Sequence, residues 1–182
     1  MQLFPDFFQV NWQQPAHLAW LNSLPNRTSA WLLSADSMTT RLTHIQNQLS
    51  VEVVCQQWLE GSRGQFWRRD VFLRLNEQPY MFAQTLIPRA VVSCLPFDVC
   101  RLQETPIGRY LFSIPTIQLQ HLLCGRVKPT ILQQQHPQYR DHFETELPFL
   151  LGRQRVFSAR KSSHSFAVIE FFLAPLADYL AT

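Results

Sequence analysis

The stretch that most constrains the fold is residues 66–88, FWRRDVFLRLNEQPYMFAQTLIP. Its first half alternates between two sets of side chains, which is the period-2 pattern of a strand with two different faces. The sets are Phe66, Arg68, Asp70, Phe72 and Arg74 on one face, and Trp67, Arg69, Val71, Leu73 and Leu75 on the other. We expect the first set to tolerate solvent and the second to face the core. Residues 76–79 predict a short turn and residues 80–87 a returning strand, so the stretch predicts a hairpin.

Arg69 is the one charge in the row that is expected to face inward. A guanidinium does not deprotonate in proteins, and burying a lone charge costs several kcal/mol, so Arg69 requires an anion. An internal carboxylate would satisfy it, as would a path along which the side chain reaches solvent. A ligand carboxylate is the other alternative, because arginine binds carboxylates in bidentate geometry. This stretch alone leaves these alternatives open.

Length and composition favour a single compact domain over residues 1–182. The 182 residues are 46% hydrophobic and 13% aromatic, enough for a sizeable core. The net charge is +3, but the lysines and arginines are scattered and form no basic run. Because phosphate binding requires clustered cations, we do not expect a nucleic-acid partner.

The sequence predicts a cytoplasmic protein. The opening MQLFPDFFQV has no basic residue before its apolar residues, unlike a signal peptide. No stretch reaches the roughly 18 to 20 apolar residues of a membrane span. Cys55, Cys94, Cys100 and Cys124 lack CxxC spacing and lie among apolar residues, which favours buried free thiols in a reducing compartment over disulfides.

Before residue 60 the sequence predicts three short helices and a strand. Residues 16–24 have leucines at helical spacing, and a second helix runs through residue 33 from a cap at Asn26 or Ser29. Asp36 is a good N-cap for a third helix, which leaves backbone N–H groups near Met38 free to attract an anion. Residues 49–58 predict the first strand.

After the hairpin, residues 89–103 are expected to be helical or irregular, and Thr105 with Pro106 predicts a second free helix start near Ile107 and Gly108. Residues 116–127, 151–158 and 165–173 predict three more strands. The polar residues 128–148 are expected to form a surface excursion or a short helix. The fold class is therefore α+β, with a six-stranded, largely antiparallel sheet, helices on one side and an internal ligand cavity.

Glu170 is the only charge in the apolar run SFAVIEFFLAP. A carboxyl group there must be neutral, paired with a cation, or part of a cavity wall. One alternative is a structural salt bridge with Arg69. The other places Glu170 and Arg69 at opposite ends of a small ligand.

Other common chemistries have no sequence support. There is no GxGxxG, P-loop or HExxH motif. His136, Asp141, His142 and Glu144 lie close together, but in a polar segment such a group is more often a solvated face than a metal site. Ser37 and the cysteines have no neighbouring base in the sequence. An apolar cavity with one arginine, one glutamate and two helix starts suits a small aromatic or cyclohexadienyl carboxylate.

Five blocks in order resemble the chorismate pyruvate-lyase family over residues 28–179. The blocks are DSMTTRL (36–42), FWRRDVFLRLNEQP (66–79), TPIGRYLF (105–112), LGRQRVFS (151–158) and IEFFLAP (169–175). The resemblance implies conversion of chorismate to 4-hydroxybenzoate and pyruvate, the committed step into the ubiquinone ring. It also implies that the protein needs no metal or organic cofactor, and we expect a cytoplasmic monomer.

The resemblance further implies the site residues. Arg69 and Glu170 would be catalytic, and Met38, Arg69, Ile107 and Glu170 would bind the substrate, with Met38 and Ile107 acting through their backbone. The chain departs from the family where Ala83 and Gln84 replace Gly-Arg before a threonine, which removes an expected second cation near the ligand. The 128–148 insertion also looks longer than usual, and the connection between the first two strands shorter.

A second function is open to the same fold. Effector domains of some transcription regulators resemble it and bind small molecules without converting them, so the chain could be a non-catalytic module for aromatic carboxylates. Such regulators carry a DNA-binding region of about 60 to 70 residues before the sensor. Fewer than fifty residues precede the first predicted strand here, which favours the enzyme.

Overall fold

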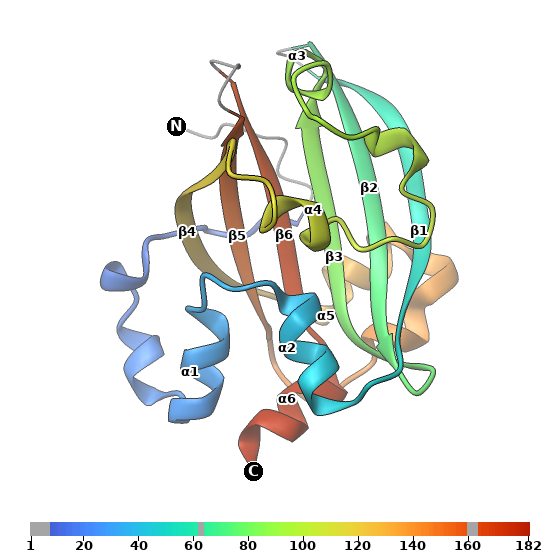
Figure 1. The fold of residues 1–182 in the computed structure, drawn as a ribbon. Helices are drawn as coiled ribbons and strands as arrows, with labels where there is room; N and C mark the ends of the chain where they lie inside the picture. Colours follow the sequence, from blue (N-terminus) through green and yellow to red (C-terminus); the bar gives the residue numbers. More distant parts are fainter. Residues whose placement is uncertain (1–7, 62–63, 160–163) are drawn as a thin grey trace.

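The computed structural model describes residues 8–61, 64–159 and 164–182, and these residues form one six-stranded antiparallel sheet with helices packed on it (Figure 1). The strand order is β1-β2-β3-β6-β5-β4. The strands are β1 (Leu49–Gly61), β2 (Gly64–Leu75), β3 (Gln78–Pro88), β4 (Ile117–Val127), β5 (Leu150–Ala159) and β6 (Ser165–Phe172). The predicted α+β class and antiparallel sheet are confirmed.

The sheet consists of two three-stranded meanders. Strands β1, β2 and β3 pair in chain order, and so do β4, β5 and β6. The meanders meet where β3 pairs with β6, from Met81 opposite Phe172 to Leu86 opposite Ala167. Residues distant in the sequence therefore become neighbours at the centre of the sheet.

The predicted hairpin is β2 and β3, with a turn tighter than expected. Asn76 and Glu77 have φ angles of 46° and 65°, and Gln78 and Pro79 already belong to β3. Positive φ at both central residues is the geometry of a two-residue turn whose twist matches that of the flanking strands.

The helices are short. They are η1 (Pro15–His17), η2 (Ala19–Ser23), α1 (Asn26–Leu32), α2 (Met38–Ile45), α3 (Arg89–Val92), η3 (Val99–Arg101), α4 (Gly108–Leu111), α5 (Pro129–Gln135), η4 (Pro137–Phe143) and α6 (Ala174–Ala181). The helix expected over residues 16–24 is two 3-10 helices instead. α1 has Pro25 at its N-cap position, with no side-chain cap.

The N-cap predicted for α2 is off by one residue. Ser37, not Asp36, is the N-cap, and its hydroxyl accepts from the Thr40 N–H at 3.4 Å. The Asp36 carboxylate instead accepts from the Ser34 hydroxyl at 3.1 Å. The helix therefore begins at Met38, one residue later than a cap at Asp36 predicts.

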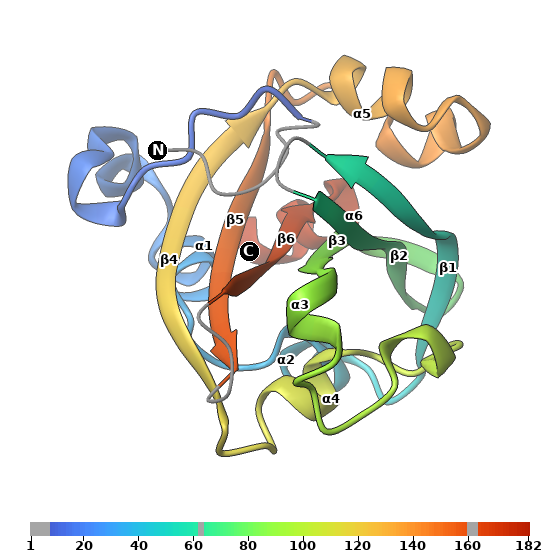
Figure 2. The same cartoon turned by 90° about the horizontal axis from the view of Figure 1, so that it is seen from above.

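The face of β2 that was expected to tolerate solvent is buried, which corrects the prediction. Asp70 and Phe72 have no exposed surface. The 128–148 insertion folds as α5 and η4 and covers this back face, on the side opposite α2 and α4 (Figure 2). Phe72 and Phe82 pack there with Leu132 of α5 and Phe143 of η4. Helices therefore cover both faces of the sheet, and not one side alone.

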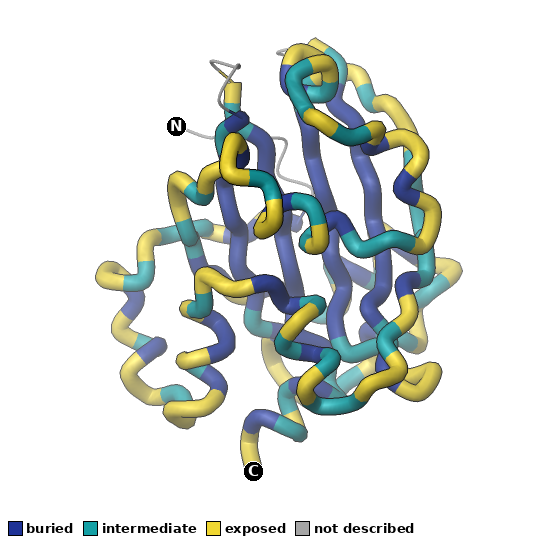
Figure 3. Tube along the Cα trace, viewed as in Figure 1, coloured by how far each residue is buried: buried dark blue, intermediate teal, exposed yellow. Residues whose placement is uncertain are grey.

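The other side of the sheet, the front face, carries two apolar clusters. One joins Val71 and Leu73 to Leu42 of α2 and Leu176 of α6. The other joins Trp67 and Ile87 to residues of the 90–119 segment, including Ile107 and Leu111. The central strands β2, β3, β5 and β6 are buried, the edge strands β1 and β4 are partly exposed, and the helices expose their outer sides (Figure 3). The space between the two clusters is where the candidate site lies.

The four cysteines are free thiols, as expected, but only Cys124 is buried; Cys55 and Cys94 are half-buried and Cys100 is exposed. Within the described ranges, no helix is long and apolar enough to cross a membrane. Residues 1–7 of the opening segment, the middle of the connection between β1 and β2, and residues 160–163 of the predicted β5–β6 loop lie outside the described residues.

Candidate functional site

Two rows of side chains cross the front face of the sheet and form the base of the site. Strand pairing places the members of each row side by side on β2, β3, β6 and β5. The first row is Arg69, Thr85, Val168 and Arg155, and the second is Val71, Ala83, Glu170 and Arg153. Neighbouring strands are about 4.8 Å apart, so the backbones of Arg69 and Glu170 are separated by roughly 10 Å across the sheet. The sheet itself holds these two charges apart.

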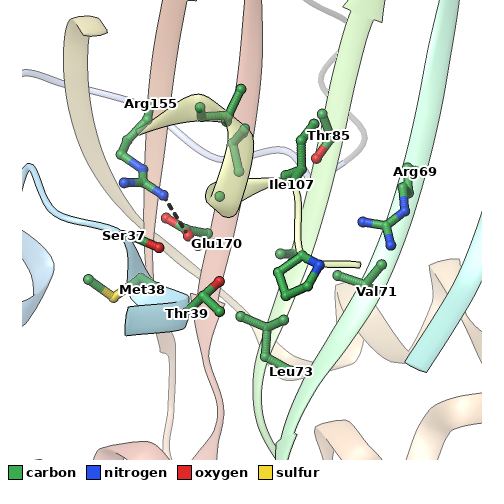
Figure 4. A pocket seen from close by; sticks show the side chains of 15 residues that line it. Ser37, Met38, Thr39, Arg69, Val71, Leu73, Thr85, Ile107, Arg155 and Glu170 are labelled. Atoms are coloured by element: carbon green, nitrogen blue, oxygen red, sulfur yellow. Dashed lines mark hydrogen bonds and ion pairs between the residues drawn. The ribbon is translucent and has the colours of Figure 1, made fainter. Parts of the chain in front are cut away.

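A pocket lies above these rows, between the two front-face clusters (Figure 4). The starts of α2 and α4 form its walls. Its lining comprises Ser37, Met38, Thr39, Arg69, Val71, Leu73, Ala83, Thr85, Pro106, Ile107, Gly108, Leu111, Arg155, Val168 and Glu170. The cavity volume is about 30 Å³, which holds about one or two water molecules and is far below the roughly 150 Å³ of an engineered cavity that binds benzene.

Arg69 lies at one end of the pocket (Figure 4). Its side chain is buried, with 2% of the residue exposed. Nη2 donates to the backbone carbonyls of Gln103 at 2.6 Å and Thr105 at 3.2 Å, while Nε is buried without a partner. Burial lowers the pKa of Arg69 to about 10, so the side chain remains charged at neutral pH. Among the described residues, no carboxylate forms an ion pair with it.

Glu170 lies at the other end and has two cationic partners. Its Oε2 accepts from Arg153 Nε at 2.7 Å, and its Oε1 accepts from Arg155 Nη2 at 2.9 Å. All three residues are at most 3% exposed. The suggested salt bridge between Arg69 and Glu170 is therefore wrong, because the neighbouring strand β5 supplies the cations for this carboxylate.

Glu170 is ionised despite its burial. Burial alone would raise the pKa of its carboxyl group, but the adjacent guanidinium groups of Arg153 and Arg155 outweigh this and hold the pKa below its usual value. Burial lowers the pKa of Arg155 to about 10, against the opposing effect of Glu170. The group of three thus carries one net positive charge at neutral pH.

Arg153 and Arg155 also fix the segment before α2. Arg153 Nη1 donates to the carbonyls of Trp31 at 3.2 Å and Ser34 at 2.7 Å. Arg155 Nη1 donates to the carbonyl of Asp36 at 2.9 Å. Of the two arginines, only Arg155 lines the pocket.

Met38 and Ile107 both line the pocket, each at a helix start. The first N–H groups of a helix have no partner within it, so both starts can offer backbone donors to an anion. The two starts approach closely at Gly108, where an added Cβ would lie 3.0 Å from Ser37 Oγ and 3.3 Å from Thr39 Oγ1. A side chain at position 108 would therefore push the walls apart.

The structure thus brings the four residues predicted from the sequence, Met38, Arg69, Ile107 and Glu170, to one pocket. Sequence reasoning missed Arg153 and Arg155. A signal was available, because two arginines at period-2 spacing lie on one face of the strand 151–158, and the other residues of that face, Leu151 and Phe157, are apolar.

The group of His136, Asp141, His142 and Glu144 is a solvated face only in part, because Asp141 and Glu144 are exposed whereas the two histidines are not. His136 is 3% exposed, and its Nε2 lies 3.5 Å from the carboxylate of Asp70. His142 Nε2 lies 3.3 Å from Arg74 Nη1. No group of three or more potential metal ligands occurs in the parts of the chain that the structure describes.

Gln84, which replaces the expected arginine, lies on the back face. It is fully buried and donates to Asp70 Oδ1 at 3.0 Å, whereas its neighbours Ala83 and Thr85 line the pocket. The substitution therefore takes no charge from the pocket wall itself.

The fold and pocket together define an open antiparallel-sheet domain with a small, charged site. A transcriptional regulator of the GntR family from Bacillus cereus shares this fold, with a TM-score of 0.51 and 11% identity over 70% of this chain and 93% of that one. The chain itself belongs to the chorismate lyase family, whose pattern matches residues 7–178. It is therefore assigned to the lyases.

Two curated relatives match nearly the whole chain, and both are described as "Probable chorismate pyruvate-lyase". The protein from Shewanella amazonensis is 29% identical and the alignment covers 97% of this chain and 94% of the relative. The protein from Shewanella frigidimarina is 30% identical, with coverage of 97% and 95%. The resemblance found in the sequence is confirmed.

Proposed function

We propose that residues 1–182 act as one unit, a chorismate pyruvate-lyase that eliminates pyruvate from chorismate and leaves 4-hydroxybenzoate. The observation that carries this proposal is the pair of charges at opposite ends of one pocket, in a chain of the chorismate lyase family. Arg69 has no carboxylate of its own among the described side chains, and Glu170 is held ionised by its arginines.

The charges at the two ends of the pocket indicate which end of the substrate each would bind. Arg69 binds the ring carboxylate, because its guanidinium is charged and lacks an internal anion. Backbone N–H groups at the helix starts near Met38 and Ile107 add further donors for the substrate. Glu170 accepts a hydrogen bond from the ring hydroxyl, which lies opposite the carboxylate on the ring.

The reaction needs little from the protein besides this placement. The bond between the ring carbon and the ether oxygen breaks, and its electron pair leaves with enolpyruvate. The carbon bearing the hydroxyl loses its proton, and the electron pair of that C–H bond completes the aromatic ring. The proton ends on the methylene carbon of enolpyruvate, giving pyruvate, so no other reactant enters the balance.

The protein therefore acts mainly by holding the substrate in a reactive, dry conformation. Because the proton can pass directly to the departing group, Glu170 need only orient the ring hydroxyl. The present cavity of about 30 Å³ is too small for the ring, so the walls must move apart when the substrate enters.

The direct test is to mix the purified protein with chorismate and follow 4-hydroxybenzoate by its ultraviolet absorbance. We expect 4-hydroxybenzoate and pyruvate in equal amounts. Tight binding of 4-hydroxybenzoate without turnover of chorismate would contradict the lyase activity and support a non-catalytic binding module instead. Binding of neither compound would overturn both functions.

The same proposal extends to the cellular role. We assign the product to the ring of ubiquinone, the location to the cytoplasm, and the active form to a monomer without metal or organic cofactor. The large apolar side chains exposed on the described surface are dispersed over several elements, which supports the monomer; they are Leu33, Trp58, Phe112, Leu147 and Phe149. Light scattering on the purified protein tests the monomer, and rescue of a strain that lacks 4-hydroxybenzoate tests the role.

A further inference from the structure

We propose that Arg155 binds the second carboxylate of the substrate, the one on the enolpyruvyl group, and so selects a dicarboxylate over a monocarboxylate. This inference rests on the proposed function and goes beyond the four residues that the resemblance implied. The structure carries it in three ways: the charge of the site, the position of Arg155, and the incomplete hydrogen bonding of its guanidinium.

The charges at the site leave room for two anions. Arg69 contributes one positive charge without an ion-pair partner among the described residues, and the group of Arg153, Arg155 and Glu170 contributes one more. Asp36 is the nearest further acid, but it is exposed and is the weakest of the influences on Arg155. A net charge of about +2 in a buried pocket is unfavourable unless a ligand neutralises it, and chorismate carries two carboxylates.

The order of groups in the site matches the order of groups on the substrate. Figure 4 shows Arg155 beside Glu170, with Arg69 at the far end. On the chorismate ring, the ether carbon is next to the hydroxyl carbon, and the carboxylate lies across the ring from the hydroxyl. With the ring carboxylate at Arg69 and the hydroxyl at Glu170, the ring can lie in two orientations, and one of them places the enolpyruvyl group beside Arg155.

The Arg155 guanidinium still has hydrogen-bonding capacity. Nη2 donates to Glu170 and Nη1 to the carbonyl of Asp36, but Nε is buried and has no hydrogen-bond partner in the described structure. The aromatic ring of Phe112 lies 4.9 Å from Cζ. A guanidinium has five N–H donors, so Arg155 can bind a ligand carboxylate without giving up Glu170.

A purely structural role, in which Arg155 only holds Glu170, makes a different prediction. The matched control is Arg153, which also binds Glu170 but is not part of the pocket lining. Loss of support for Glu170 would weaken all ligands that use the hydroxyl contact. Loss of a carboxylate partner would weaken only ligands with a second carboxylate.

The experiment measures the Kd of two stable ligands by calorimetry. These are 4-hydroxybenzoate, with one carboxylate, and 3-(carboxymethoxy)-4-hydroxybenzoate, which adds a second carboxylate at the position of the enolpyruvyl ether. In Arg155→Gln, we expect the Kd of the dicarboxylate to rise about tenfold or more and that of 4-hydroxybenzoate to change much less. In Arg153→Gln, both should weaken in the same proportion.

Arg155→Lys keeps the charge and should recover part of the preference for the dicarboxylate, which also covers the case in which Arg155→Gln does not fold. Equal weakening of both ligands in Arg155→Gln would overturn the proposal, and so would a wild-type protein that does not prefer the dicarboxylate. Because neither ligand reacts, this result is independent of turnover. A chain that shows the preference but does not convert chorismate would contradict the proposed function alone.

Discussion

Arg68 and Arg69 are adjacent on β2, and both are buried, but they differ in what neutralises them. Arg68 lies on the back face, where its Nε donates to Asp70 Oδ2 at 2.8 Å. Arg69 lies on the front face, where Nη2 donates only to the backbone carbonyls of Gln103 and Thr105. One arginine has its counter-ion within the chain, and the other has carbonyl dipoles and an adjoining pocket.

This difference separates structural from functional charge. A buried ion pair that is complete within the fold leaves no reason to expect a ligand. A buried charge without a counter-ion is a cost to the fold that a ligand can remove. Arg153 and Arg155 are intermediate, because they share the single carboxylate of Glu170.

The largest effect on stability is expected from a substitution of Glu170, whose carboxylate pairs with two arginines. Glu170→Gln leaves the Arg153 and Arg155 guanidinium groups buried without an anion, and we expect the free energy of unfolding to fall by about 3 to 5 kcal/mol. Urea unfolding followed by tryptophan fluorescence measures this loss. The kcat of the remaining folded protein should also fall, because an amide orients the ring hydroxyl less well than a carboxylate. An unchanged stability would mean that the arginines are not buried as described.

The second largest effect is expected from breaking the ion pair between Arg68 and Asp70 on the back face. Arg68→Ala leaves Asp70 as a buried carboxylate that retains only Gln84 and the imidazole of His136, so we expect a loss of about 3 kcal/mol. The kcat/KM per folded molecule should stay near that of the wild type, because Arg68 is not part of the pocket lining. A variant with full stability and low activity would reverse the comparison between the two arginines.

Arg69→Ala should show the opposite pattern. We expect kcat/KM for chorismate to fall roughly 10- to 150-fold, because a charge-assisted contact is lost. This factor corresponds to a loss of about 1.5 to 3 kcal/mol of transition-state stabilisation. The free energy of unfolding should change less than in Arg68→Ala, since the charge that is removed has no counter-ion. Steady-state kinetics and urea unfolding on the same preparations give both numbers. A folded variant with wild-type kcat/KM would remove Arg69 from the site.

The smallest expected effect is a dependence of stability on pH, which arises from His136 beside Asp70 on the back face. Burial lowers the pKa of His136, with Asp70 opposing and Arg68 adding to this shift. The unfolded chain takes up the proton near pH 6.5 and the folded chain resists it, so stability should decline as the pH falls below about 6.5 and stay level above it.

Thermal unfolding between pH 8 and 5.5 measures this decline, and His136→Gln should reduce it. The matched control is His121→Gln, at an exposed histidine, which should leave the decline intact. An identical pH profile in all three proteins would contradict the assignment to His136.

Local pattern was enough to predict the strands and the two isolated charges. Alternation with a period of two residues shows which side chains share a face of a strand. A charged residue in an apolar row can be recognised without knowing which segment packs against that face. This is why Arg69 and Glu170 could be picked out, and why the helix starts at Met38 and Ile107 could be located. The structure adds that these two charged residues and the two helix starts line the same pocket.

What could not be predicted depends on contacts between distant segments. The cover over Phe72 and Asp70 comes from α5 and η4, about sixty residues further along the chain, and nothing in β2 shows that it exists. The register that places Arg153 opposite Glu170 is likewise not set by the pattern of either strand. Glu170 and the two arginines were therefore each visible in the sequence, but the pairing between them was not.

The seam between the two meanders has a consequence for how the protein matures. Arg69 belongs to the first meander, and Glu170 and Arg155 belong to the second. Within the sheet, the two meanders are joined where β6 pairs with β3. A chain still leaving the ribosome without β6 holds one end of the pocket and lacks the other. A ligand that contacts both ends of the pocket would connect the two meanders and stabilise the sheet against their separation.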